Sequence, residues 1–280
     1  MKESAKIMTK YALMECTRGY GVSAQILFSA ARKLDPSYMF VHNLGYYYLL
    51  QGKCYIVAGK WWIYGKVNYR RAGRLLLRAR KLCPESFETL CALGELKEKQ
   101  HRYSAAIEYM DQAIGIRPLS GYVHWKKAGI LFLQKKYAEL VNYINMLMGQ
   151  PVDFDGKEML FFMICAYAEY NAYGIIKPAT LTKIMSFVDG VSLADADDDF
   201  VLELLLDAIP VFFVSTKFEY VTKCDTLLKM QGTYSNTIQQ MISSSSCGGE
   251  NLTAPEDIQK EFINYPIANR WYQSLYLAGD

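Results

Sequence analysis

Positive charge concentrated in one stretch is the first chemistry that this sequence offers. Nine Lys and Arg residues lie between Asp35 and Glu85, with no acidic residue among them. Arg70, Arg74 and Arg78 recur every four residues, so a helix over 66–81 places them on one face. Such a row, preceded by a cluster of Tyr and Trp residues, suits acidic peptides, phosphate groups or nucleic acid. A solvated helix face explains the same pattern, and both interpretations stay open.

Residues that could hold a metal or carry covalent chemistry are sparse. The three histidines, His42, His101 and His124, never lie four residues apart, and the cysteines form no CxxC pair. The acidic run that begins at Asp195 lacks the Gly and Glu positions of a calcium loop. Phosphate-binding glycine loops and the nucleophile elbow are absent as well. We therefore expect no enzymatic activity, no metal and no cofactor.

The charge balance and the cysteines bear on the surroundings of the chain. The net charge is only +3, but residues 1–150 are basic in excess and residues 151–280 acidic in excess. This polarity favours separate partners at the two ends or contacts between copies, and it leaves a homodimer open. The first ten residues lack the apolar core of a secretory signal, and no apolar run is long enough to span a bilayer. With scattered, unpaired cysteines, we predict a cytoplasmic or nuclear chain away from membranes.

Small residues at regular intervals divide residues 87–120 into two paired helices. Gly94 in the first helix and Ala106 and Ala113 in the second let two antiparallel backbones pack closely. Pro118 cannot continue a helix and so ends the second one. One such pair cannot bury its apolar face alone, so neighbouring pairs must stack on it. Since no run shows the strict alternation of a half-buried strand, we predict an all-α fold.

The spacing of Leu93-Gly94, Tyr103, Ala106 and Pro118 resembles that of the tetratricopeptide repeat. The resemblance implies a right-handed α–α superhelix of helical hairpins. Prolines in register with Pro118 end the other units at Pro36, Pro84 and Pro151. The unit before Pro84 is longer than the others by about one helix, so residues 52–66 hold an insertion. An additional helix would explain it, but we favour a first helix that continues past residue 52 and is followed by a loop.

The repeat pattern divides the chain into two predicted regions. Residues 1–151 hold the recognisable repeats and the insertion, whereas residues 152–280 hold divergent helical repeats and capping helices. Asp155, with Glu158 three residues on, is expected to cap the first helix of the second region. The last two helices are expected near 256–263 and 267–277.

Relatives with this repeat bind extended peptides on the concave surface that their first helices form, and the resemblance implies such a surface here. The implied contact residues are His42, Asn43, Tyr46, Glu95, Trp125 and Lys126, to which the basic face adds Arg70, Arg74 and Arg78. In relatives that bind the C-terminal carboxylate of a chaperone, Lys, Asn and Arg side chains come together on this surface. Here Thr9, Tyr46 and Glu95 occupy those places, which argues against a chaperone-tail clamp.

Residues 46–87, with their long gap between helices and their Leu-Cys-Pro end, also resemble the repeat subunits of the anaphase-promoting complex. That resemblance implies a subunit of a larger assembly such as a ubiquitin ligase. We predict a scaffold or adaptor that binds protein partners through a peptide or helix in its groove. The alternative is a helical-repeat protein that binds RNA or phosphate groups through the basic stripe at 66–81. The absence of groove-binding motifs disfavours nucleic acid.

Overall fold

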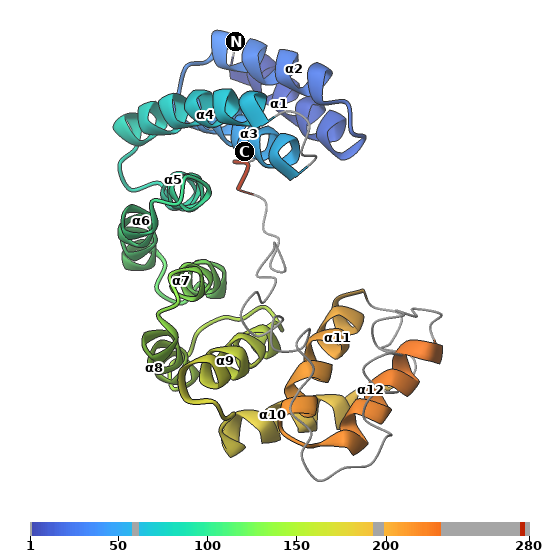
Figure 1. Cartoon of the computed structure of the whole chain (residues 1–280). Coiled ribbons are helices and arrows are strands. Elements are labelled where there is room, and N and C mark those ends of the chain that lie inside the picture. Colours follow the sequence, from blue (N-terminus) through green and yellow to red (C-terminus); the bar gives the residue numbers. More distant parts are fainter. Residues whose placement is uncertain (1, 58–61, 193–198, 231–274, 278–280) are drawn as a thin grey trace. The chain divides into compact units, whose positions relative to one another are not determined.

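The computed structural model describes residues 2–57, 62–192, 199–230 and 275–277, which form twelve helices and no strand (Figure 1). The chain packs as two compact units, residues 1–130 with 273–280, and residues 131–272. Unit 1 holds α1 (Lys2–Thr17), α2 (Gly21–Leu34), α3 (Tyr38–Val57), α4 (Trp62–Leu82), α5 (Phe87–Lys99), α6 (Tyr103–Ile116) and most of α7 (Gly121–Leu133). Unit 2 holds α8 (Tyr137–Met148), α9 (Glu158–Tyr173), α10 (Pro178–Gly190), α11 (Asp199–Val214) and α12 (Phe218–Met230).

Helical hairpins build unit 1, with α1 paired to α2, α3 to α4 and α5 to α6. Small residues lie where the paired helices cross. A Cβ atom added to Gly94 in α5 would come within 2.6 Å of the Met110 side chain and 3.4 Å of the Ala106 carbonyl oxygen in α6. Gly45 in α3 meets Leu76 of α4 in the same way, at 3.0 Å. The predicted all-α fold of nested hairpins is confirmed.

The second hairpin is longer than the third because both of its helices are extended. α3 has 20 residues and α4 has 21, against 13 in α5 and 14 in α6. α3 continues past Gly52, as expected, and residues 58–61 lie outside the described chain. At Gly52 an added Cβ would lie only 2.4 Å from the Tyr69 ring, so a glycine is needed where the two long helices touch.

Unit 2 packs α9 against α8, α10 and α11, and pairs α11 with α12. The Tyr167 hydroxyl of α9 donates to the Asp207 carbonyl of α11 at 3.0 Å. The capping prediction for Asp155 is wrong, since α9 begins at Glu158 and Lys157 precedes it without a side-chain cap. Asp155 instead takes a left-handed φ of 52°, and its N–H binds the Asp153 carboxylate at 3.0 Å. The acidic residues stabilise a turn before the helix rather than the helix end.

The predicted C-terminal helices fall largely outside the described residues, including all of 256–263. Of the second one, Leu275–Leu277 are described, and they are not helical. That part of the prediction is wrong, because the backbone groups of Leu275 and Leu277 bind side chains of α3 instead of forming helical hydrogen bonds. We call Leu275–Leu277 the terminal segment; Figure 1 shows it beside α3 in unit 1.

Candidate binding surfaces

Two neighbouring polar residues in the first half of α3 are fully buried, although the side chains around them in the sequence are apolar or aromatic. His42 and Asn43 both have an exposed fraction of 0%. The Asn43 Nδ2 donates to the Leu277 carbonyl oxygen at 3.0 Å, and the Leu277 N–H donates to Asn43 Oδ1 at 2.8 Å. One carboxamide thus satisfies both backbone groups of one residue, as a neighbouring strand would. Such a pair binds peptide backbone whatever its side chains are.

His42 binds the same segment two residues earlier. Its Nε2 lies 2.5 Å from the Leu275 carbonyl oxygen, which can only accept, so Nε2 carries the proton. Nδ1 is then the acceptor for the Thr89 hydroxyl, 3.1 Å away on α5. Burial lowers the pKa of His42 to about 4 against the smaller opposing effect of the Leu275 hydrogen bond. The imidazole is therefore neutral at neutral pH, with both ring nitrogens engaged.

The Tyr276 ring fills an aromatic slot between α2 and α3. It stacks on Phe28 with ring centroids 5.3 Å apart and meets the Tyr46 ring edge-on at 5.0 Å. Cys16 packs against the same cluster, and Leu275 is only 1% exposed. Residues 275 and 277 bind α3 through their backbones while the side chain between them enters the slot, which is the alternation of an extended chain. We call the surface made by Phe28, His42, Asn43 and Tyr46 the terminal-segment groove.

A second buried polar cluster lies further along the first helices of the hairpins, and its polar groups are paired by side chains of these helices alone. Glu95 of α5 is 2% exposed and pairs with Lys53 of α3 at 2.8 Å and Lys126 of α7 at 3.3 Å. The Tyr122 hydroxyl also donates to its carboxylate. Burial alone would raise the pKa of Glu95, but Lys126 and Lys53 hold it far below its usual range. We call these four residues the Glu95 cluster. Trp125, beside it in sequence, is buried at 1% exposure.

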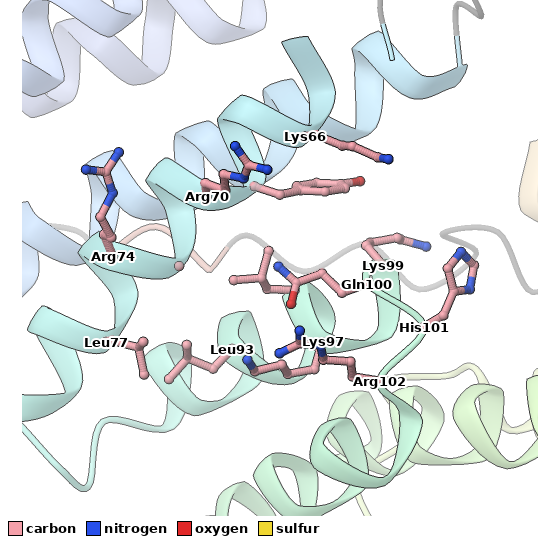
Figure 2. A pocket seen from close by; sticks show the side chains of 13 residues that line it. Lys66, Arg70, Arg74, Leu77, Leu93, Lys97, Lys99, Gln100, His101 and Arg102 are labelled. Atoms are coloured by element: carbon pink, nitrogen blue, oxygen red, sulfur yellow. The ribbon is translucent and has the colours of Figure 1, made fainter. Parts of the chain in front are cut away.

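A basic pocket of about 910 Å³ lies between α4, the end of α5 and the turn before α6 (Figure 2). Its cationic lining residues are Lys66, Arg70, Arg74, Lys97, Lys99 and Arg102, and no acidic side chain lines it. Leu77, Leu93 and Leu96 supply an apolar floor. Arg78, the third member of the predicted stripe, does not line the pocket.

The structure thus divides the predicted site residues among different environments. His42, Asn43 and Tyr46 meet in the terminal-segment groove. Glu95 and Lys126 are paired with each other, and the buried Trp125 offers no accessible face. Sequence reasoning missed the terminal segment, which it assigned to a helix. It also missed the α5 side of the basic pocket, although Lys97 and Lys99 close the next first helix and were visible as a signal.

Other chemistry has few candidates in the described part of the chain. No group of three His, Cys, Asp or Glu residues there is placed to hold a metal ion. The five cysteines whose side chains are described form no disulfide, and burial raises the pKa of Cys165 and of Cys224 to about 12. None of the described helices combines the length and apolar character needed to cross a membrane.

Comparison with solved structures agrees with the repeat pattern. The chain superposes on PilF of Pseudomonas aeruginosa with a TM-score of 0.60 and 15% identity, covering 86% of this chain and 98% of PilF. A tetratricopeptide repeat protein from Parabacteroides merdae gives a TM-score of 0.54 and 13% identity, covering 95% and 100%. No family model and no curated protein sequence matches the chain. The fold is that of tetratricopeptide-repeat proteins.

Proposed function

We propose that this chain is a protein-interaction scaffold whose unit 1 binds an extended segment of a partner. The observation that carries the proposal is the two-way pairing of the Asn43 carboxamide with the backbone of Leu277. Every residue except proline presents such an N–H and C=O in an extended peptide, so the pairing suits a protein ligand. We assign no catalytic task to His42, since Leu275 and Thr89 occupy its two ring nitrogens.

The Glu95 cluster supports this proposal by fixing the surface in advance. Its members come from α3, α5 and α7, so the buried ion pairs join three successive first helices. Unpairing any of them would leave a buried charge, which penalises sliding of one helix past another. A surface held in this way loses less freedom on binding, and more of the contact energy is available for affinity.

A peptide-display selection tests the scaffold proposal. The bait is the full-length chain with Leu275→Asp and Tyr276→Ala, which frees the terminal-segment groove. Selected peptides should lose about tenfold or more in affinity when Asn43→Ala is added, because two buried backbone bonds are lost. The matched control is Asn171→Ala in unit 2, whose carboxamide donates within its own helix, to Tyr167 at 2.8 Å. Peptides that bind all three chains equally would refute the proposal.

The finer assignment is that the chain serves as a subunit of a larger assembly such as a ubiquitin ligase. It rests on the resemblance of residues 46–87 to subunits of the anaphase-promoting complex. A cytoplasmic or nuclear location rests on the unpaired cysteines in the same way. Size-exclusion chromatography of the native complex from its own cell tests the assembly, and elution at the size of a lone chain would count against it.

The basic pocket favours a second candidate function, the binding of phosphate groups or acidic side chains. Arg70, Arg74, Lys97 and Arg102 form no ion pair with another described residue, so their charge is available to an anion. Carbonyls at the end of α5 would repel an anion, but turn N–H groups already bind them, as in Arg102 N–H to the Lys97 carbonyl at 2.9 Å. RNA fits less well, because Tyr69 is only 5% exposed and offers no face for a base to stack on.

Fluorescence titration separates these anions. The probes are a labelled hexaglutamate peptide, a doubly phosphorylated peptide and a ten-nucleotide single-stranded RNA. Arg70→Gln with Lys97→Gln should weaken the peptide probes about tenfold, whereas the control Arg78→Gln, on the same helix face but outside the pocket, should leave them nearly unchanged. Equal losses in both variants would indicate diffuse attraction rather than a site. Tighter binding of the RNA would favour nucleic acid instead.

A further inference from the structure

The terminal-segment groove already holds a peptide, and that peptide belongs to the same chain. Resting on the proposed function, we propose that Leu275–Leu277 is a built-in ligand. It competes with outside partners, whose binding segments carry an apolar side chain followed directly by an aromatic one. The identity of the bound residues therefore specifies the class of partner, which the repeat pattern alone does not.

The aromatic position is the most selective of the three. The Tyr276 ring stacks on Phe28 at an interplanar angle of 7° and meets the Tyr46 ring edge-on at 77°. Offset stacking and edge-to-face contact each favour an aromatic ring over an aliphatic side chain of similar area. Leu44, Tyr47 and Ala12 form the buried cluster behind it. An aliphatic residue at this position would forfeit both ring contacts.

The aliphatic positions differ in their requirements. Leu275 is 1% exposed, so a charged residue there would be buried without a partner. Leu277 is partly exposed, and the protein holds it through its backbone N–H and C=O. An outside ligand therefore needs an apolar residue at the first position, an aromatic one at the second, and any residue except proline at the third, where the N–H must donate.

Attachment to the same chain gives the terminal segment an advantage over free ligands. A ligand carried on the same chain binds intramolecularly, at an effective concentration that reaches roughly the millimolar range when the connection is short and spans the two sites. A free peptide with the same three residues is thus excluded at ordinary concentrations. A partner must bring further contacts along unit 1, or the terminal segment must first be released. Competition of this kind makes occupancy of the groove a controlled step.

Binding of a labelled peptide tests the competition. The probe is a fluorescein-labelled copy of residues 273–280, QSLYLAGD. The three full-length chains are the native one, the Leu275→Asp/Tyr276→Ala chain, and the latter with Asn43→Ala. We expect the probe to bind the Leu275→Asp/Tyr276→Ala chain at least about tenfold more tightly than the native chain, and to lose that gain with Asn43→Ala. A probe with Tyr replaced by Leu should bind more weakly than the native probe.

Alkylation of Cys16 supplies a second readout that does not depend on peptide affinity. Cys16 packs in the cluster that Tyr276 covers. Its modification by iodoacetamide, followed by mass spectrometry, should be several-fold faster in the Leu275→Asp/Tyr276→Ala chain and should slow again when the probe saturates the groove. Equal Cys16 rates and equal probe affinity in the two chains would overturn the inference.

The outcomes also separate this inference from the scaffold proposal. If display peptides bind in an Asn43-dependent way but the QSLYLAGD probe does not bind, the scaffold stands and the built-in ligand is refuted. If no peptide depends on Asn43, both fall. If the native chain is a dimer that the Leu275→Asp/Tyr276→Ala change dissociates, the groove holds the terminal segment of a second copy, and competition within one chain is refuted.

Discussion

The terminal-segment groove and the Glu95 cluster are two buried polar regions on the first helices of successive hairpins. Their buried polar groups find hydrogen-bond and ion-pair partners in opposite ways. Asn43 and His42 bind backbone that lies more than 230 residues away in the sequence. Glu95 binds side chains of the neighbouring hairpins. A partner that the chain carries on a separate segment can be exchanged for another, whereas a partner fixed in the adjoining helix cannot. The comparison therefore distinguishes a binding surface from an internal brace.

The largest loss of stability is expected when the Glu95 cluster loses its carboxylate. Glu95→Gln leaves Lys53 and Lys126 without their carboxylate in a site where side-chain exposure is only 15% and 12%. We expect a loss of about 3–5 kcal/mol in the free energy of unfolding of unit 1, measured by urea titration. The control is Asp111→Asn, whose carboxylate pairs with Lys127 at 2.6 Å but is 51% exposed, so its loss should cost less than about 1 kcal/mol. Similar losses in both variants would show that the Glu95 cluster is no brace.

Acid should weaken the groove through His42. The pKa of this buried imidazole is lowered to about 4, against about 6.5 for a histidine in the unfolded chain. The unfolded chain therefore binds a proton at a pH where the folded chain does not. The stabilisation is complete above about pH 6.5 and is lost as the pH falls toward 4, by an amount on the order of 3 kcal/mol. The difference between native and His42→Gln stability, followed from pH 8 to pH 4, isolates this contribution. A difference that does not change with pH would contradict it.

Gly94 adjoins Glu95 in α5 but has no polar side chain, and it affects stability only through the close packing of α5 on α6. A substitution there separates the effect of packing from the effect of the buried charges. Gly94→Leu displaces the end of the Met110 side chain and brings its own added atoms against the Ala106 carbonyl, so it should cost about 1–3 kcal/mol in thermal or urea unfolding. Gly115→Leu on α6 meets no atom within 4 Å and serves as the control. If the two substitutions destabilise unit 1 equally, the close crossing does not determine how α5 packs on α6.

The smallest effect on stability should come from Asn43→Ala, which removes the bonds to Leu277. We expect a loss of about 1 kcal/mol, since water can replace Asn43 once the terminal segment leaves. The same substitution should weaken peptide binding to the groove about tenfold or more. Measured together, urea unfolding and peptide titration should show the reverse pattern from Glu95→Gln, which changes stability first. A loss of stability as large as that of Glu95→Gln would remove the distinction between the two regions.

The hairpins could be predicted from the sequence because their contacts are local. Gly94 and Ala106 lie twelve positions apart, and Pro118 marks the end of the same unit, so one window of sequence contains the whole pattern. The terminal segment could not be predicted, because three residues carry no periodicity and their partners are on α3. Its composition favoured a helix, but bonds to Asn43 and His42 over a long sequence separation determined its conformation.

The candidate surfaces were predictable in part for the same reason. Arg70 and Arg74 share one helix face, which spacing alone indicates, and that face lines one side of the basic pocket. Lys97 and Arg102 form the other side from the next hairpin, and their distance from α4 depends on how the hairpins stack. Asp155 shows that a local motif can also mislead, since the residues of a capping box suit a turn as well. Asp155 takes a left-handed φ and stabilises a turn instead of capping α9.

The proton on His42 has a consequence for the direction in which a chain can lie in the groove. The Asn43 carboxamide presents one donor and one acceptor, and a half-turn of its terminal torsion exchanges them, so it fits a peptide running either way. His42 has no such freedom, because Nδ1 faces the Thr89 hydroxyl and its one outward nitrogen, Nε2, donates to the Leu275 carbonyl. Only a chain that places a carbonyl at that spot, two residues before the one held by Asn43, completes both sets of bonds. A buried imidazole on α3 thereby gives the groove its N-to-C orientation.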